Sequence, residues 1–313
     1  MQVHGHATGR YYVHVVYCPG TGTYEGFRRP NPAKSLPKVG HWRTTPLSKH
    51  KPLRYSGTRK AGPYLPASMP VAFAPGTYND MPDASVRQRV RAMQALAAEG
   101  RLLAVVLEMA DRGNSTASLP AQASEAEVRR ALAWEDRGWP WVQYGPVVMA
   151  AVRAGVPVWG GNLPAARLRP TMGDAALDGV VPPPVSERLL AAIREGHCGA
   201  LPDAMTPGML RVQVARDRAM AATITERLQS AGRPGQVLLL TGAQHASRDR
   251  GVPWHLTQGG TLAPEAVHVV LFEGAASGLV ADERRSAELT EGPDPCEELR
   301  RSRPQPPARD KAL

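Results

Sequence analysis

The chain has 313 residues, of which 42% are hydrophobic and 5% aromatic, and its formal net charge is +10. This amount of apolar material supports one sizeable core, alone or with a small satellite, and it excludes several full domains. No run of about 18 apolar residues occurs, so we expect no membrane-spanning helix. The N-terminus lacks the charged start and small-residue cleavage site of a signal peptide, so the sequence as written predicts a cytoplasmic protein.

The positive charge lies in the N-terminal third of the chain. Residues 1–100 hold 14 Lys and Arg against 4 Asp and Glu, which leaves 24 against 24 for residues 101–313. Residues 1–85 are rich in Pro, Gly and Lys and lack sustained apolar periodicity, so we expect a basic arm that is largely disordered. A basic arm can bind nucleic acid, but no nucleic-acid motif accompanies this one, and we expect no nucleic-acid partner.

Residues 86–275 alternate between helical and strand patterns. Taken in chain order, the patterns predict a helix over 86–99, a strand over 102–107, a helix opened by a capping box at Ser124 and Glu127, a helix over 146–154, a strand over 156–159, helices over 186–195 and 206–229, and strands over 236–241 and 267–272. Short, nearly all-apolar strands between helices are typical of a parallel sheet covered on both faces. We therefore expect an α/β fold with a three-layer α/β/α core, a mainly parallel sheet, a small helical subdomain over 186–229 and a polar C-terminal tail over 276–313.

Two side chains able to hold a metal or move protons emerge from the predicted strands. Glu108 follows the first strand and His245 follows the third. In open α/β sheets, ligands bind outside the carboxyl ends of the strands, so we expect any chemistry there. Asn162 follows the second strand and the pair Gly160 and Gly161, which permits close backbone approach. If these strands are parallel, Glu108, Asn162 and His245 gather at one end of the sheet.

The long helix over 206–229 contributes a polar stripe. Gln213, Arg216, Asp217 and Met220 recur at intervals of three and four residues, so they share one helix face. Such a face can border the crevice, and equally Arg216 and Asp217 can be solvated or paired with neighbouring helices.

The three cysteines, Cys18, Cys198 and Cys296, lie far apart in the sequence. Their spacing matches neither a metal site nor a disulfide framework, and we expect neither.

Five motifs occur in order between residues 86 and 275: LAVVLEMADRGN, ALAWEDRGWPWVQYGPVVMAAVRAGVPVWGGNLP, HCGALP, MLRVQVARDRAMA and LLLTGAQHASRDRGVPWHL. Together they resemble the ChaN family of haem-binding uptake proteins, which belongs to the Tiki and erythromycin-esterase-like superfamily. The resemblance implies a three-layer α/β/α core with a small helical domain and a bacterial, iron-regulated role in haem binding. It also implies that an outer-membrane haem receptor system is a partner. Family members are often membrane-anchored lipoproteins, and they can form homodimers around stacked haems with tyrosine as an iron ligand.

The resemblance assigns roles to individual residues. Glu108 matches the acidic residue of the family's Leu-Glu-Met motif, His245 the histidine of its Gly-x-x-His motif, and Tyr144 the tyrosine of its Trp-x-x-Tyr-x-Pro motif. The family's opening motif, Gly-Glu-x-His, is absent from residues 71–90, where we expect the first strand. A divalent-metal site of two carboxylates and two histidines would keep only Glu108 and His245.

Haem binding needs an iron ligand and partners for the propionates. Tyr144 is the only tyrosine after Tyr78, so it is the candidate for a phenolate ligand, although it lies among three tryptophans and can equally be a packing residue. Arg248 and Arg250 follow His245 and can pair with propionates through bidentate hydrogen bonds, or they can be ordinary loop arginines.

Two functions of different classes therefore compete. The first is a haem-binding protein of bacterial iron uptake, with haem held at the C-terminal edge of the sheet near His245, Asn162 and Arg216. The alternative is a metal-assisted or Glu/His-dependent hydrolase with Glu108 and His245 as its catalytic pair, which the missing opening motif disfavours. A third hypothesis is a damaged gene with a reading-frame slip within residues 1–85, and translating the other frames would test it.

Overall fold

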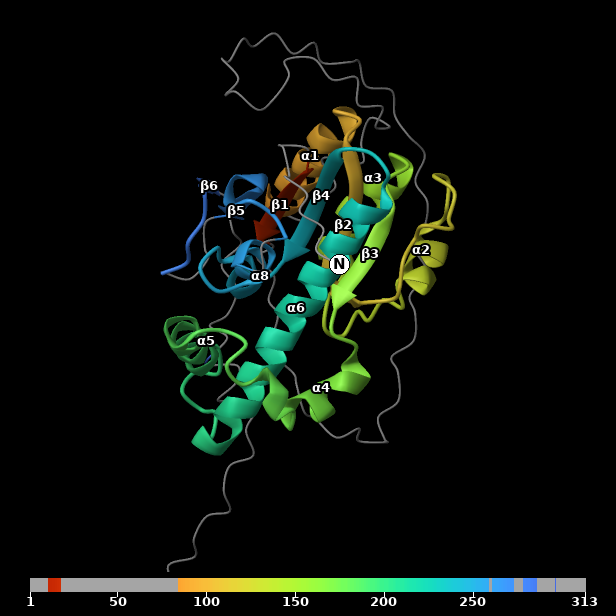
Figure 1. Ribbon diagram of the computed structural model, residues 1–313. Coiled ribbons are helices and arrows are strands. Elements are labelled where there is room, and N and C mark those ends of the chain that lie inside the picture. The colour runs from red at the N-terminus through yellow and green to blue at the C-terminus, as the bar shows by residue number, and fades with distance from the viewer. Residues whose placement is uncertain (1–10, 18–83, 259–260, 273–277, 286–295, 297–313) are drawn as a thin grey trace, which may run out of the picture. The chain divides into compact units, whose positions relative to one another are not determined.

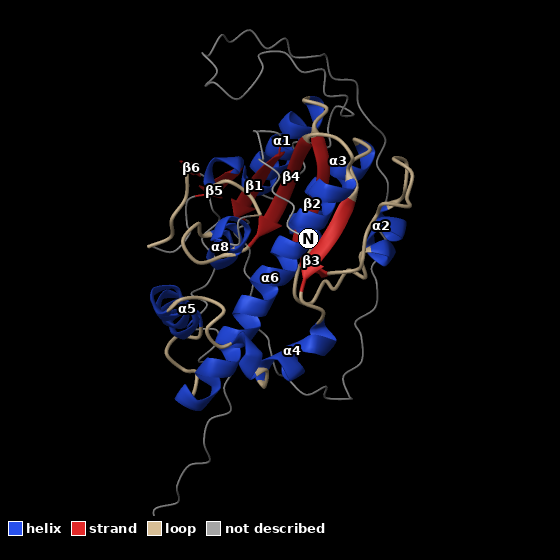
Figure 2. Ribbon diagram, viewed as in Figure 1, coloured by secondary structure: helices blue, strands red, loops and turns tan. Residues whose placement is uncertain are grey.

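The computed structural model describes residues 11–17, 84–258, 261–272, 278–285 and Cys296. The rest of the expected basic arm and most of the expected C-terminal tail lie outside these described residues. The described residues form a mixed α/β unit built on a parallel sheet (Figures 1 and 2). The expected fold class is therefore confirmed.

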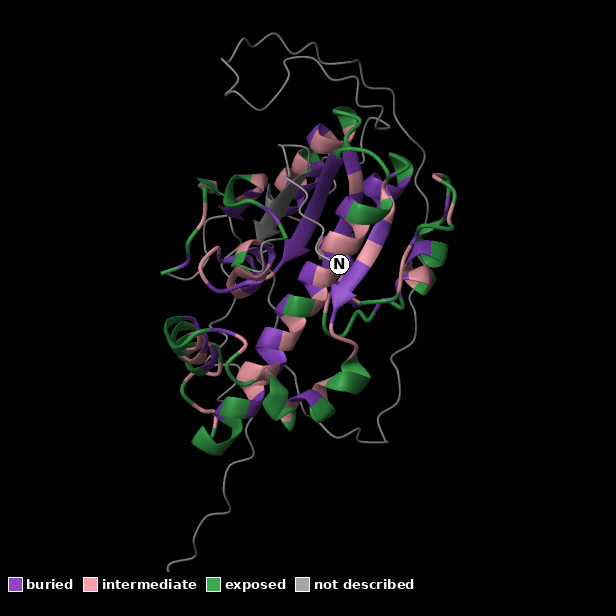
Figure 3. Cartoon of the chain, in the orientation of Figure 1, coloured by how far each residue is buried: buried purple, intermediate pink, exposed green. Residues whose placement is uncertain are grey.

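The sheet of the described chain has six strands in the order β3-β2-β4-β1-β5-β6, and every neighbouring pair is parallel. A purely parallel sheet needs cover on both faces, and β4 is accordingly buried along its whole length (Figure 3). The strands are β1 Tyr11–Tyr17, β2 Leu102–Asp111, β3 Val158–Asn162, β4 Gly235–Thr241, β5 Val267–Phe272 and β6 Glu283–Arg285.

The α-helices of the described chain are α1 Ala84–Ala98, α2 Glu125–Ala131, α3 Trp141–Arg153, α4 Ala165–Met172, α5 Pro183–Gly196, α6 Thr206–Ser230, α7 Ala243–Ala246 and α8 Val252–Gln258. Three short 3-10 helices, η1 Ala175–Leu177, η2 Asp203–Met205 and η3 Pro264–Ala266, complete the set. The capping box of Ser124 and Glu127 opens α2 as expected. Among the described helices, none combines the length and the apolarity that crossing a bilayer requires.

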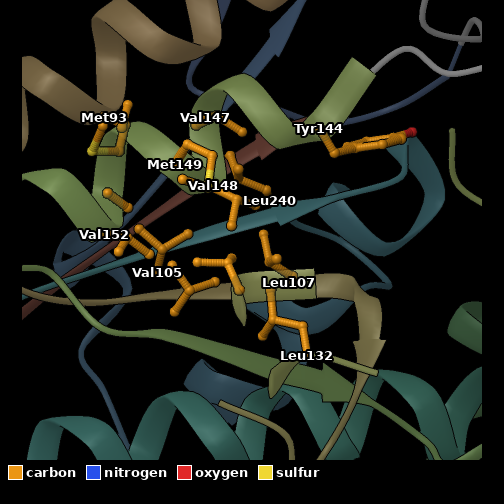
Figure 4. Packing of buried hydrophobic residues seen from close by; sticks show 14 of the residues in the cluster. Met93, Val105, Leu107, Leu132, Tyr144, Val147, Val148, Met149, Val152 and Leu240 are labelled. Atoms are coloured by element: carbon orange, nitrogen blue, oxygen red, sulfur yellow. The ribbon is translucent and has the colours of Figure 1, made fainter. Parts of the chain in front are cut away.

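Two helical layers cover the two faces of the sheet. Because side chains alternate along a strand, Val105 and Leu107 of β2 pack against α1, α2 and α3, whereas Ala104 and Val106 pack against α6 and α8. Alternate residues of β4 divide in the same way. Figure 4 shows the first of these clusters, and the two together make the three-layer core that the sequence predicts.

A helical extension lies beyond the carboxyl ends of the strands and consists of α4, α5 and the first half of α6 (Figure 1). The core of this extension is small. Only Val181, Val185, Leu189 and Val214 are buried together in it, with Trp254 of α8 partly buried against them. The extension is thus joined to the main core through α6 and α8.

The position of β1 corrects the expectation for the N-terminal arm. Tyr11–Tyr17 is a strand rather than disordered chain, and it pairs with β4 on one side and with β5 on the other. The register joins Val13 to Val237 and to Val267. The sequence analysis missed this strand because its seven residues stand alone in a basic stretch, with no neighbouring periodic segment to identify them as part of a core.

The C-terminal region also differs from the expectation of a simple polar tail. β6 pairs with β5 at the edge of the sheet, and Cys296 forms a disulfide bond with Cys198, with Cα atoms 5.6 Å apart and 98 residues between them in sequence. The expectation that the cysteines form no disulfide is therefore wrong for this pair. Sequence spacing does not reveal which distant cysteines meet, because the fold alone brings them together.

Candidate functional site

Glu108 lies on β2 and faces α6. Residues two apart on a strand point to the same face of the sheet, so Glu108 shares the α6 side with Ala104 and Val106. Its carboxylate is buried. One carboxylate oxygen, Oε2, accepts hydrogen bonds from the Thr241 hydroxyl at 2.8 Å and from the Gly242 backbone N–H at 2.6 Å. The end of β4 therefore fixes the carboxylate of the neighbouring strand.

His245 bridges two carboxylates. The residue lies in α7, directly after β4, and is 4% exposed. Its Nε2 is 3.3 Å from Oε1 of Glu108, and its Nδ1 is 2.6 Å from Oδ1 of Asp217 on α6. The side-chain amide of Gln213, one turn earlier on α6, lies 3.0 Å from the same Nδ1. Both ring nitrogens are thus engaged by protein groups.

Arg216 connects this arrangement to β3. Its Nε donates to Oδ1 of Asn162 at 2.9 Å, and its guanidinium lies 3.9 Å from Oε1 of Glu108. Glu108, Asn162 and His245 therefore meet at the carboxyl end of three neighbouring strands, as the parallel-sheet argument predicts. The expected polar stripe of α6 is also confirmed, because Gln213, Arg216 and Asp217 all face this cluster.

Glu108, Asp217, Arg216 and His245 form a group that we call the buried quartet. Burial alone would raise the pKa of the Glu108 carboxyl, but His245 and Arg216 hold that pKa well below its ordinary value. Burial alone would lower the pKa of His245, but Glu108 and Asp217 hold it well above 6.5. His245 is therefore an imidazolium at neutral pH. The quartet thus pairs two carboxyl groups with a histidine and an arginine, and buried charges are tolerated when they are paired in this way.

Two glycines allow the backbone to approach this region. A Cβ on Gly160 would lie 2.1 Å from the Asp111 carbonyl oxygen, so β3 can approach β2 here only with glycine. A Cβ on Gly251 would lie 2.1 Å from the carbonyl oxygen of His245. The close approach expected at Gly160 is thus present, and Gly251 packs the loop after β4 against the backbone of His245.

The structure gives no support for a divalent metal at the quartet. Both ring nitrogens of His245 lie against carboxylate oxygens, so in this arrangement neither is free to bind an ion. Within the part of the chain that the structure describes, no group of three or more His, Cys, Asp or Glu side chains could hold a metal ion. Glu108 and His245 thus form an ion pair here, so the structure gives no support to the metal role considered for them.

Tyr144 lies away from the quartet, in the core on the opposite face of the sheet. It is 1% exposed and belongs to the packed cluster of Figure 4. Its ring meets Trp139 edge to face at a centroid distance of 5.7 Å. The guanidinium of Arg89 lies 5.3 Å from its ring centroid. The structure therefore places Tyr144 as a packing residue of α3 and does not bring it together with Glu108 and His245.

Arg248 and Arg250 hold protein segments together. Arg248 bonds to the Asp282 carboxylate at 2.8 Å and to the backbone carbonyls of Pro264 and Val267. Arg250 is 5% exposed and donates to the Gln244 side chain at 3.2 Å, as well as to the Asp249 carboxylate and the Gly278 carbonyl. Both arginines thus bind the segment after β5 to the loop after β4.

Three residues that the sequence analysis did not single out gather where α6 meets α8. His255 is partly buried and its Nε2 has no hydrogen-bond partner among the described residues. Burial lowers the pKa of His255. The negative charge of Asp217 opposes this effect and the positive charge of Arg218 adds to it, and the net shift is downward, which favours the neutral imidazole. The Trp254 ring meets His255 edge to face at 4.9 Å, and Arg218 is exposed. The sequence could have indicated these residues, because Trp254 and His255 are adjacent in the motif LLLTGAQHASRDRGVPWHL.

A hollow of about 500 Å³ lies elsewhere, between the start of α2 and the end of α3. Ala121, Gln122, Ala123, Ser124, Glu125, Met149 and Arg153 line it. This lining has no histidine, tyrosine or tryptophan and shares no residue with the quartet, so we attach no function to it.

Comparison with known proteins identifies the family. Residues 81–256 match the model of the family described as haem-binding uptake, Tiki superfamily, ChaN. The chain belongs to this family. A solved structure described as cofacial heme binding to ChaN of Campylobacter jejuni is 20% identical to the chain, with a TM-score of 0.51. The match covers 63% of the present chain and 80% of the Campylobacter jejuni chain. At that identity the likeness shows the fold alone. A search of curated proteins finds no match.

The opening motif expected from the ChaN resemblance, Gly-Glu-x-His, remains missing from residues 71–90. Of residues 71–90, where we expected that motif, 71–83 lie outside the described residues and 84–90 belong to α1. The first strand of the sheet is instead β1. The sequence of β1, YYVHVVY, contains no glutamate. The sequence predicts that the opening motif of the ChaN family is missing, and β1, which lies between β4 and β5 in the sheet, does not supply its glutamate either.

Proposed function

We propose that the protein binds haem where α6 and α8 meet, beside the carboxyl ends of the strands. The observation that carries the proposal is membership of the ChaN family of haem-binding uptake proteins. The fold of the Campylobacter jejuni ChaN supports it, because that structure is titled for cofacial heme binding.

Described residues at this position carry the groups that haem needs, but the Nε2 atom of His255 is itself buried, so iron can reach it only if neighbouring side chains move aside. His255 offers a neutral imidazole with an unpartnered Nε2, which is the form that coordinates iron. Trp254 supplies apolar aromatic surface next to it, and the exposed Arg218 can pair with a propionate. We propose His255 as the iron ligand in preference to Tyr144 and His245, because the phenol of Tyr144 is packed in the core and both nitrogens of His245 are engaged.

In this assignment the quartet positions the site. Asn162, Arg216 and His245 hold the ends of β3 and β4 against α6, and α6 in turn packs against α8. Arg218 replaces Arg248 and Arg250 as the proposed propionate partner, since those two arginines already bind protein acceptors. Haem supplies a redox-active iron when it is bound, and the protein residues supply one ligand, an apolar wall and charge neutralisation.

The test is a titration of the purified full chain with hemin, followed by the Soret band. We expect saturable binding by the wild type and at least about 10-fold weaker binding, with a shifted Soret maximum, by His255→Ala. The matched control is His268→Ala, because His268 is a half-exposed histidine near the amino end of β5, whereas the proposed site lies beside the carboxyl ends of the strands. Absence of saturable binding by the wild type would contradict the proposed function, and equal binding by His255→Ala would contradict the ligand.

Tyr144→Phe distinguishes the two ligand assignments. It removes only the phenol oxygen from a packed ring, so we expect its hemin affinity and spectrum to equal those of the wild type. Weaker hemin binding by Tyr144→Phe, with a Soret maximum different from that of the wild type, would instead make Tyr144 the iron ligand.

We extend the proposal to a role in iron uptake, which rests on the family description alone. A homodimer, a haem receptor partner and a lipid anchor are further hypotheses that the same family would supply. A hydrolase is disfavoured, because the motif that would complete its acid and histidine set is absent from residues 71–90 and both ring nitrogens of His245 are engaged by carboxylates.

A further inference from the structure

The disulfide between Cys198 and Cys296 joins two parts of the chain that are far apart in the sequence. Cys198 lies in the turn after α5, and Cys296 lies beyond β6, the last strand of the described chain. The bond closes a loop over a sequence separation of 98 residues, which spans α6, β4, α8 and β5. A link over such a separation restricts the unfolded chain strongly.

The turn that carries Cys198 is closely defined. Its backbone N–H donates to the Glu195 carbonyl at 2.8 Å, and the N–H of Gly199 donates to the Arg194 carbonyl at 2.9 Å. Cys198 has a φ of 56°, in the left-handed region that non-glycine residues rarely adopt. The turn thus ends α5 with the sulfur of Cys198 directed to Cys296.

The noncovalent attachment of α5 is limited. The helix contributes Val185 and Leu189 to the buried cluster that it shares with α6, Ile193 is also buried, and Arg188 pairs with Asp249 at 2.9 Å. Most of its other side chains are partly or fully exposed. A helix of 14 residues with so small an apolar contact is marginal on its own. Small structural units that cannot build an adequate core are where disulfides are typically found.

We propose that the Cys198–Cys296 disulfide is a covalent clamp on the end of α5, and that the protein matures in an oxidising compartment. This inference stands apart from haem binding. It replaces the expectation of a cytoplasmic protein, because structural disulfides persist where thiols are oxidised and are rare in the reducing cytoplasm.

The chemistry of the clamp is thiol–disulfide exchange. The two thiols lose two electrons and two protons as the sulfur–sulfur bond forms, and a disulfide of the donor, whether a protein or a small molecule, is reduced to two thiols. Reduction by a dithiol runs the same exchange backwards and releases α5.

Peptide mapping tests the bond directly. Protein refolded with oxidised and reduced glutathione, or exported by its host, is blocked at free thiols and digested with trypsin without reductant. The expected product is peptide 195–211 linked to peptide 286–300, with Cys18 alone carrying the blocking group. Blocking groups on Cys198 and Cys296 in that protein would overturn the proposal.

Reduction of the folded wild type tests the clamp. We expect dithiol to lower Tm by about 5–10 °C and to speed amide exchange in α5 at least about 10-fold, with little change in β4. Cys296→Ser should match the reduced wild type and gain no further sensitivity to dithiol. Cys18→Ser is the matched control, because it removes the cysteine outside the bond and should retain the full response. If the linked peptide is present but neither Tm nor exchange in α5 changes on reduction, the bond is not a clamp.

Discussion

The charges of the buried quartet cancel only while all four partners are present. Glu108→Gln removes one negative charge and leaves His245 and Arg216 facing a neutral amide. Because an unpaired buried charge is costly, we expect the free energy of unfolding at pH 6 to fall by about 3–5 kcal/mol. The measurement is urea denaturation followed by circular dichroism. Glu226→Gln is the matched control, because Glu226 pairs with Arg112 at the surface and its loss should cost no more than about 1 kcal/mol.

The difference in stability between wild type and Glu108→Gln should depend on pH. The lowered pKa of Glu108 contributes stability that is present above 4.5 and is lost as pH falls toward the folded-state value. The raised pKa of His245 contributes stability that is present below 6.5 and is lost as pH rises through its folded-state value. The gap should therefore be widest between pH 4.5 and 6.5 and narrow on both sides. A gap that keeps widening above pH 6.5 would show that His245 is not held as an imidazolium.

At the scale of elements, the expected strands after residue 100 were found because each is a short apolar run between helical patterns. Parallel strands bring their carboxyl ends to one edge, so the meeting of Glu108, Asn162 and His245 was predictable before their distances were known. The helices α4 and α8 were not predicted, because each is short and has proline within or near its first turns. The bridging role of His245 was also out of reach, since it depends on how deeply α6 packs.

β1 provides the sharpest test at this scale, since a central strand cannot be removed without leaving two strands unpaired. Deleting residues 1–17 would expose the backbone of β4 and β5 along the register that β1 now satisfies. We expect the deletion to abolish cooperative thermal unfolding, as measured by circular dichroism. The control is deletion of residues 1–8, which stops short of the strand and should leave Tm within a few degrees of the full chain. An unchanged Tm for the larger deletion would instead restore the interpretation of this region as an arm outside the core.

At the scale of the whole molecule, the quartet, α8 and the disulfide all connect segments to α6 or to its neighbours. β2, β3 and β4 are tied to α6 by the quartet, α6 packs against α8, and the disulfide fastens α5 beside them. The proposed haem site is therefore assembled from segments that come together only in the folded chain. A ligand of such a site binds the native state and not the unfolded state, so haem binding and stability are linked.

This linkage gives a prediction that does not depend on the spectrum of the bound iron. Hemin at about 100 times its dissociation constant should stabilise the fold by about 2.7 kcal/mol and raise Tm by about 5–10 °C in differential scanning calorimetry. At the same hemin concentration, His255→Ala should show a much smaller rise because its site is less occupied, whereas His268→Ala should follow the wild type. Iron-free protoporphyrin separates the contributions, since it keeps the apolar surface and propionates but offers His255 no metal. An equal rise in Tm with protoporphyrin and hemin would mean that Trp254 and Arg218 hold the ligand and that His255 does not coordinate the iron.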